Sequence, residues 1–181
     1  MKPLLSDDLI TLRPPEPGDL DSMYLWENDT RLWNVGTTSA PFSRAILESY
    51  IAGYSADIYA ERQLRLVIID NDSGAQAGCV DLFDFDPVNL RAGVGIIVDP
   101  RFRRRGFARH ALALLERYCA VRLGMHQLWA AVPADNTPSR AAFAAAGYSV
   151  SGRLRSWVRS GASYTDAYIY QLMPLLADRQ L

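Results

Sequence analysis

Apolar and polar residues alternate along the chain with two periods, one typical of strands and one typical of helices. Turn residues separate the three strand-like runs between positions 64 and 99, which predicts an antiparallel meander. A strand, a helix and another strand follow over 91–132, and this crossover predicts two parallel neighbours. The expected strands are 8–15, 64–70, 77–86, 91–99, 125–132, 148–158 and 164–173, and the expected helices are 16–29, 43–55, 107–124 and 135–147.

This order of elements predicts an α/β (α+β) fold, with about seven strands in one mixed, mostly antiparallel sheet and helices on both faces. Capping residues mark where helices begin: Asp19 and Ser43 for the first two, and Thr137 for the last. Gly147 follows the end of that last helix, as a C-terminal glycine does. A loop through Gly36 separates the first helix from the second.

Composition indicates an ordinary globular protein. Of the 181 residues, 49% are hydrophobic and 22% are charged, and no repeat or low-complexity linker divides the chain. The sequence shows no signal-peptide pattern and no apolar run near the ~20 residues of a membrane span. Cys79 and Cys119 fit no metal-ligand spacing, so we expect buried thiols and no metal site. We therefore expect one soluble domain over residues 1–181, in the cytoplasm.

One stretch departs from the balanced formal charge of −1: RFRRRGFARH, residues 101–110, has five arginines in ten positions. It lies between an expected strand and the start of an expected helix, where unpaired N–H groups and the helix dipole bind anions. Gly106 lets the backbone approach an anion closely, and Ala108 keeps the first helical turn slim. The context favours a phosphate cradle over a solvated patch. The overall charge of the chain disfavours a nucleic-acid-binding site.

Two common nucleotide-binding motifs are excluded by their residues. A P-loop needs a lysine, and the only lysine is Lys2. A Rossmann fingerprint needs its glycines after the first strand, whereas the GVG at 93–95 lies inside a later one. The cradle therefore belongs to another class of phosphate-binding protein.

Two segments carry a resemblance to a known family. VDPRFRRRGFA (98–108) resembles the acetyl-CoA-binding signature [RQ]-x-x-G-x-[AG] of the GCN5-related N-acetyltransferases (GNAT). NTPSRAAFAAAGY (136–148) is similar to that family's N-x-x-S-x-x-x-[YF]-x-x-x-G-[YF] segment, at about the expected distance downstream. The element order matches too, so the resemblance covers nearly the whole chain. Residues 78–100 and 147–173 are most similar to the branch of spermidine and ribosomal-protein alanine acetyltransferases.

The resemblance implies that the fourth and fifth strands splay apart and that the pantetheine arm of acetyl-CoA pairs with the backbone between them. It implies that amides from Arg104 to Arg109 hold the pyrophosphate, and that an N–H near Val98 stabilises the oxyanion of the tetrahedral intermediate. Asn136 would hydrogen-bond the pantetheine region, and Arg140 would either reach a phosphate or stay solvated. The implied cofactor-binding residues are Ile96, Ile97, Val98, Arg103, Arg104, Arg105, Gly106, Phe107, Ala108, Arg109, Asn136, Ser139, Arg140 and Phe143.

The residues that would handle protons depart from the family pattern. An alkylammonium resembles lysine, with a pKa of about 10.4, so a base or a water chain must remove a proton before the amine attacks. Many relatives carry a tyrosine acid where this chain has Phe143, and a glutamate where it has Gly93. The candidate catalytic carboxylates are Glu27, Asp81 and Asp84, and a solvent-facing role is the alternative for each.

The acidic residues in WEND (26–29) and DLFDFD (81–86) suggest a cationic acceptor. The leading hypothesis is an acetyl-CoA-dependent N-acetyltransferase acting on a primary amine, such as a terminal amine of spermidine. The alternatives are acetylation of a protein N-terminal amine and a catalytically weak acyl-CoA-binding sensor. A homo-oligomer is compatible with the family, and no nucleic-acid or membrane partner is expected.

Overall fold

The computed structural model describes residues 3–33 and 38–174; Gly36, in the predicted loop, lies outside them. The described chain forms one seven-stranded sheet in the order β1-β2-β3-β4-β5-β7-β6. The strands are β1 (Ile10–Arg13), β2 (Leu64–Asp70), β3 (Gln76–Asp86), β4 (Arg91–Val98), β5 (Gln127–Pro133), β6 (Ser149–Ser160) and β7 (Ser163–Leu172). The helices are α1 (Leu20–Glu27), α2 (Arg44–Ala52), α3 (Ile58–Glu61), α4 (Phe107–Val121) and α5 (Thr137–Ala145), with short 3-10 helices η1 (Pro17–Asp19) and η2 (Pro100–Phe102).

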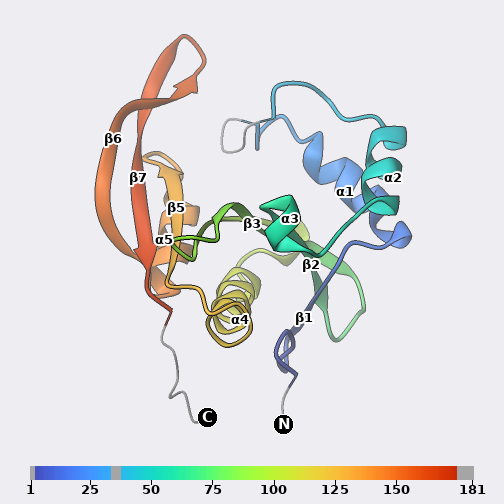
Figure 1. The fold of residues 1–181 in the computed structure, drawn as a ribbon. Helices are drawn as coiled ribbons and strands as arrows, with labels where there is room; N and C mark the ends of the chain where they lie inside the picture. Colours follow the sequence, from blue (N-terminus) through green and yellow to red (C-terminus); the bar gives the residue numbers. More distant parts are fainter. Residues whose placement is uncertain (1–2, 34–37, 175–181) are drawn as a thin grey trace.

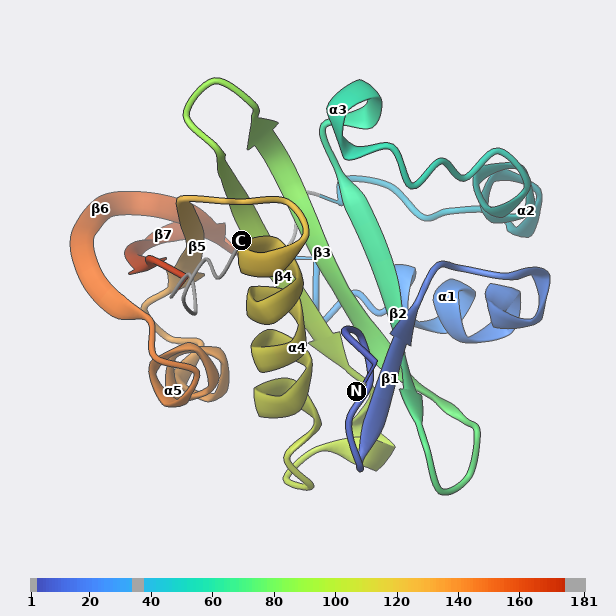
Figure 2. The ribbon, with the colours of Figure 1, turned by 60° about the horizontal axis from the view of Figure 1, so that its bottom comes forward.

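Helices cover both faces of the sheet, as predicted (Figure 1 and Figure 2). Alternate side chains of β2 point to opposite faces of the sheet, and both sets include apolar residues, so each face is covered by helices. Leu66 and Ile68 belong to the core cluster that includes α4. Val67 packs instead with Met23 of α1 and Ile51 of α2. The expected α/β fold with a mixed, mostly antiparallel sheet is confirmed.

Helix α4 is the central element of one face, and its buried side chains recur at helical spacing. They include Phe107, Ala111, Leu112, Leu115 and Cys119. Cys119 and Cys79, the latter on β3, are free and buried as the sequence predicted. Burial raises the pKa of both thiols, so neither is a reactive thiolate near neutral pH.

The parallel pair β4–β5 separates soon after it begins. Only Arg91–Gly93 of β4 pair with residues 127–129 of β5. Farther along, β4 remains paired with β3 up to Val98, while β5 pairs with β7 as far as Pro133. The predicted splay is confirmed, and it leaves one edge of β4 without a neighbouring strand past Gly93.

The first predicted helix is shorter than 16–29, and Asp19 occupies its N-cap position as predicted, but without a capping hydrogen bond. The chain forms the turn of η1 before α1 begins. Asp19 does not cap α1 with its side chain, because that buried carboxylate accepts hydrogen bonds from both terminal nitrogens of Arg13 at 2.7 and 2.8 Å. Ser43 caps α2 as predicted, accepting from the N–H of Ile46.

The cap of α5 is Asn136, one residue before the predicted Thr137. Its Oδ1 accepts a hydrogen bond from the N–H of Ser139 at 3.2 Å. Both residue types are good caps, so the motif alone does not separate them. The sequence also missed α3, because one helical turn is too short to show a hydrophobic period.

Candidate active site

The turn between β4 and α4 leads into the start of α4, where backbone N–H groups have no partner within the helix. Arg104 and Gly106 have φ of 60° and 87°, so the chain twice enters the left-handed region just before α4 begins. Gly106 is the N-cap and offers no side-chain acceptor, so the N–H groups of the first helical turn stay unpaired within the helix. Such a turn is a concave anion site with the positive end of the helix dipole behind it.

Gly106 is required by its backbone conformation rather than by crowding. A Cβ built there would lie 3.6 Å from Cδ2 of His110, an ordinary contact. A φ of 87° is costly for any residue with a Cβ. The left-handed turn is therefore the physical reason for a glycine at this position.

The arginines of this turn have different surroundings. Arg101 is held by Asp99, whose carboxylate accepts from its Nε at 2.9 Å. That charge-assisted bond, opposed by burial, lowers the pKa of Asp99 to about 2. Arg105 lies over the rings of Phe102 and Phe107, 5.2 Å from each centroid. Arg104 makes no hydrogen bond or ion pair with any described residue that the structure records, so its guanidinium is available to an anion.

The edge of β4 exposed by the splay carries usable backbone donors. The N–H of Asp99 donates to the carbonyl of Ala77 on the β3 side. Because successive residues of a strand point their backbone groups to opposite sides, the N–H groups of Ile96 and Val98 point into the opening. The Val98 carbonyl also faces that side, since it accepts from Nε of Arg103 at 3.1 Å.

The predicted residues of α5 lie on the other side of the splay. Arg140 donates to the carbonyl of Ala134 at 3.0 Å and lies over the ring of Tyr168, which fixes its position without neutralising its charge. Phe143 is only 2% exposed and packs edge-to-face on Tyr148. A contact between its ring and a ligand would require the ring to leave the core.

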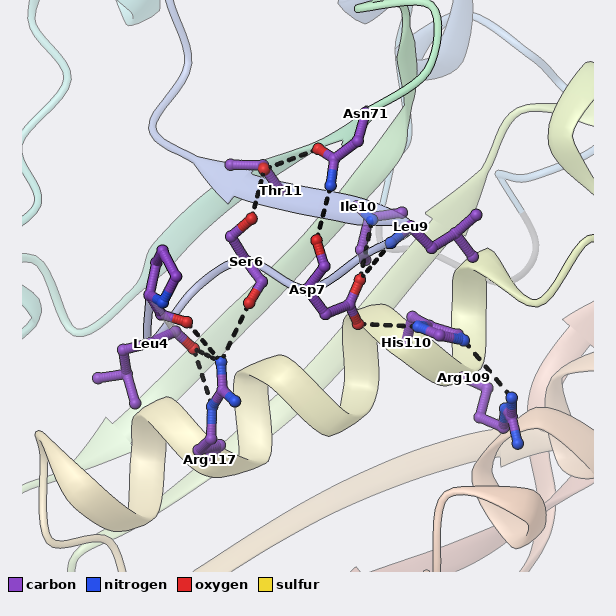
Figure 3. A network of polar contacts seen from close by, with 11 residues as sticks. Leu4, Ser6, Asp7, Leu9, Ile10, Thr11, Asn71, Arg109, His110 and Arg117 are labelled. Atoms are coloured by element: carbon purple, nitrogen blue, oxygen red, sulfur yellow. Dashed lines mark hydrogen bonds and ion pairs between the residues drawn. The ribbon is translucent and has the colours of Figure 1, made fainter. Parts of the chain in front are cut away.

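The N-terminal segment holds the first turn of α4 in place (Figure 3). Oδ2 of Asp7 lies 2.8 Å from Nδ1 of His110, one turn into the helix. The other oxygen of Asp7 accepts from the N–H groups of Leu9 and Ile10, which start β1. Farther along α4, Arg117 donates to carbonyl oxygens of residues 3, 4 and 6. The helix end that carries the candidate anion site is therefore tied to β1.

Two of the three predicted carboxylates meet through a residue that the sequence reasoning missed. Arg65 of β2 lies between them, with Nη1 2.5 Å from Glu27 and Nε 2.8 Å from Asp81. Burial opposes the charged guanidinium, but Asp81 and Glu27 keep the pKa of Arg65 well above its usual value. Arg65 and Asp81 are register partners across β2 and β3. The turn residues predicted between the strands 64–70 and 77–86 were therefore a signal for an antiparallel pair that contains both residues.

Asp84 lies apart from this cluster. It occupies an irregularity of β3 between the pairs Phe83–Gly93 and Asp86–Arg91, with a φ of 49°. Its side chain is exposed and helps to line a cavity of about 470 Å³. The structure therefore divides the three candidate carboxylates between two places on the sheet.

Gly93 has a specific neighbour that explains the absence of a larger residue. A Cβ at Gly93 would lie 2.3 Å from the ring of Phe83. That ring also packs edge-to-face on Trp129 of β5, with centroids 5.3 Å apart. At Gly95 a Cβ would make only ordinary contacts, because its nearest neighbour would be an atom of the Phe83 ring 3.8 Å away. Phe83 thus occupies the space that a glutamate at position 93 would fill.

The described residues contain no group of three or more His, Cys, Asp or Glu side chains that could hold a metal ion. None of the helices within 3–33 and 38–174 is long and apolar enough to cross a membrane.

Known proteins share this sequence pattern and this fold. The chain is 27% identical over 161 residues to spermidine N(1)-acetyltransferase of Escherichia coli K12, covering 87% of this chain and 82% of that one. It is 24% identical over 176 residues to the uncharacterised N-acetyltransferase YoaA of Bacillus subtilis, covering 96% and 98%. Spermidine N-acetyltransferase of Vibrio cholerae, solved with CoA and spermine, superposes with a TM-score of 0.82 at 21% identity, covering 93% and 97%.

A dodecameric structure of the Vibrio cholerae enzyme gives a TM-score of 0.76 at 23% identity, covering 93% of this chain and 95% of that one. At these identities the solved structures establish the fold. The acetyltransferase (GNAT) domain family matches residues 10–149, most of the chain. The chain therefore belongs to the GNAT acetyltransferase family and is an acyltransferase.

Proposed function

We propose that the protein transfers the acetyl group of acetyl-CoA to a primary amine of a polycation such as spermidine. The observation that carries the proposal is the open edge of β4, which joins an anion-binding turn to a face bearing carboxylates. Gly106 lies at the turn, and Gly95 lies opposite Asp81 on the carboxylate face. The relatives support the choice of substrate, since the Escherichia coli protein is a spermidine acetyltransferase and the Vibrio cholerae protein binds CoA and spermine.

Backbone N–H groups make most of the proposed contacts with the acetyl donor. The first-turn amides of α4, with Arg103 and Arg104 beside them, hold the phosphates of the donor. The N–H groups of Ile96 and Val98 pair with its extended arm as a neighbouring strand would. The Val98 N–H polarises the thioester carbonyl, where negative charge develops during attack.

The acceptor side is the face of the sheet that carries Arg65. Two carboxylates and one guanidinium give the Glu27–Arg65–Asp81 cluster a net charge of −1, which attracts an ammonium group. Gly95 presents no side chain beside Asp81, so an amine can approach the thioester over the bare backbone. A carboxylate of this cluster accepts the proton of the ammonium, directly or through water.

Little acid catalysis is needed at the leaving group. A thiol has a pKa of about 8.5, so a thiolate leaves readily near neutral pH. Phe143 cannot donate a proton, and Gly93 supplies no carboxylate. Holding the amine against the thioester therefore supplies most of the acceleration.

Release of free thiol from acetyl-CoA over a panel of amines tests this function, with mass spectrometry of the product. The panel contains spermidine, spermine, putrescine, butylamine and a peptide with a free N-terminal alanine. We expect acetylated polyamines and, for Asp81→Asn, a loss of about a hundredfold in kcat/KM. Asp72→Asn, on the exposed β2–β3 turn, is the matched control and should behave as wild type.

Other outcomes distinguish the alternatives. Turnover of the peptide alone would identify a protein N-terminal acetyltransferase. Tight binding of acetyl-CoA without turnover of any amine would identify a sensing module, which the absence of proton-handling side chains at positions 93 and 143 would favour. Either result would contradict the polyamine proposal.

The proposal extends to assembly and location. β6 is the edge strand of the sheet, and it carries the exposed Trp157 on a hairpin that projects away from the helices (Figure 1). A long edge strand is a template for pairing with a second copy, and one structural relative is a dodecamer. Two free thiols suit a reducing compartment such as the cytoplasm. Light scattering of the purified protein tests the assembly, and a mass equal to one chain would contradict it.

A further inference from the structure

A cavity lies on the proposed acceptor face, displaced along the sheet from the Glu27–Arg65–Asp81 cluster. Its volume is about 470 Å³, and it is formed where β3, β4, β5 and β7 meet. The residues that line it are Asp84, Asp86, Arg91, Gln127, Trp129 and Gln171. The two motif segments at 98–108 and 136–148 contain none of them, and neither does the proposed donor site.

The cavity lies on the same face as the acceptor path. On β5, Leu128 and Ala130 belong to the core cluster that includes α4, so Trp129 between them points to the opposite face. On β3, Asp81 and Phe83 are two residues apart and therefore share a face, and the ring of Phe83 contacts Trp129. Asp81, Phe83 and Trp129 thus form a continuous surface from the Arg65 cluster to the cavity.

The charge of the cavity favours a cation. Asp86 is paired with Arg91 at 3.2 Å and accepts a hydrogen bond from Asn89. Asp84 is exposed, and the structure records no ion pair or hydrogen bond between its carboxylate and any described residue. With two carboxylates and one guanidinium, the lining has a net charge of −1, and the uncompensated carboxylate is Asp84.

An aromatic surface connects the two carboxylate sites. Phe83 covers Gly93, and its contact with Trp129 makes an apolar floor that suits an alkyl chain. The face of Trp129 also attracts an ammonium group. From Gly95 to the irregularity at Asp84 the sheet advances two to three residues, roughly 7 to 10 Å at about 3.3 Å per residue.

We propose that this cavity is a second-ammonium subsite: the alkyl chain of the acceptor lies on Phe83 and Trp129, and a cation remote from the reacting amine binds Asp84. The inference rests on the proposed function and sharpens it, because it makes the acceptor a long amine with at least two positive charges. It also gives Phe83 a role, since a glutamate at position 93 would displace the ring from the acceptor path.

The ratio of kcat/KM for spermidine to kcat/KM for butylamine tests the subsite, because butylamine has no second cation. We expect this ratio to fall roughly threefold to fivefold in Asp84→Asn, as for a solvent-accessible ion pair, and to fall in Trp129→Leu as well. Asparagine tolerates a positive φ at least as well as aspartate, so the backbone at position 84 is kept. Asp72→Asn is the control and should leave the ratio unchanged.

The outcomes separate the two proposals. A ratio that is unchanged in Asp84→Asn, or an equal fall for both amines, would overturn the subsite while spermidine turnover by the wild type still supports the proposed function. A wild type that acetylates no amine would overturn both. A lowered ratio in Asp84→Asn with unchanged thermal melting would establish a binding effect rather than a folding defect.

Discussion

At the scale of single residues, the site is defined by side chains that fix or exclude one another. Phe83 fills the space above Gly93, and Arg65 binds Glu27 and Asp81 together, so these contacts join β3 to β4 and β2 to both α1 and β3. The effect of a single substitution on stability or activity should therefore depend on the residue that the changed side chain contacts.

Two neighbouring glycines of β4 offer a matched comparison. In Gly93→Ala the new Cβ must push the Phe83 ring out of its contact with Trp129, and the lost aromatic pair should cost about 1 kcal/mol of stability. Gly95→Ala has room for its Cβ and should stay within about 0.5 kcal/mol of wild type. Urea denaturation measures both. Equal stabilities for the two variants, or a Gly93→Ala penalty that persists in a Phe83→Ala background, would contradict this account.

Asp99 gives a prediction about pH. Its carboxylate accepts hydrogen bonds from Arg101 and from the indole of Trp26, and its pKa is lowered to about 2, against about 3.9 in an unfolded chain. A lowered pKa stabilises the fold above the unfolded value, and this contribution disappears as the pH falls through the folded value. Asp99→Asn should therefore be less stable than wild type at pH 6, by about 1 to 2 kcal/mol.

The difference between these two proteins should shrink as the pH falls from about 4 towards 2. Melting temperatures of both proteins over this range provide the measurement. A difference that stays constant with pH would show that the carboxylate is not held in its charged form.

At the scale of elements, the sequence predicted the helices and strands that have clear periods or caps, together with the β4–β5 splay implied by the family resemblance. It missed α3 and the cap of α5, because a single turn has no period and because Asn136 and Thr137 are both residue types that cap helices. It also left Arg65 out of the site, since the link to Asp81 exists only once the register of β2 and β3 is known. The boundaries of elements and their register are the information that local patterns lack.

The cap of α5 allows two possible roles of Asn136 to be separated. Its Oδ1 is used by the Ser139 N–H, which leaves the amide NH₂ free to donate to the donor molecule. Asn136→Ser keeps a good cap and removes that amide, so its stability should be close to wild type while the KM for acetyl-CoA rises. Asn136→Ala should lose about 1 kcal/mol of stability in addition. An unchanged KM in both variants would reduce Asn136 to a capping residue.

At the scale of the whole molecule, two halves of the proposed reaction meet at one strand. β4 borders the anion-binding turn at its end, bears the open backbone edge along one side, and faces the carboxylates of β3 through Gly95. The α4 end is fixed by the N-terminal segment through Asp7 and His110 (Figure 3), and the Arg65 cluster joins α1 to the sheet. The fold thus brings the proposed donor and acceptor sites together from segments far apart in the sequence.

The proposed reaction depends on binding of the acetyl donor by the turn at Gly106, and calorimetric titration with acetyl-CoA measures that binding. Gly106→Glu places a negative side chain at the proposed anion site, whereas Gly74→Glu puts the same change at another glycine with positive φ, in the open β2–β3 turn. Wild type and Gly74→Glu should bind acetyl-CoA alike, and Gly106→Glu should not bind it. Equal affinity in Gly106→Glu, or no binding by the wild type, would contradict the proposed donor site.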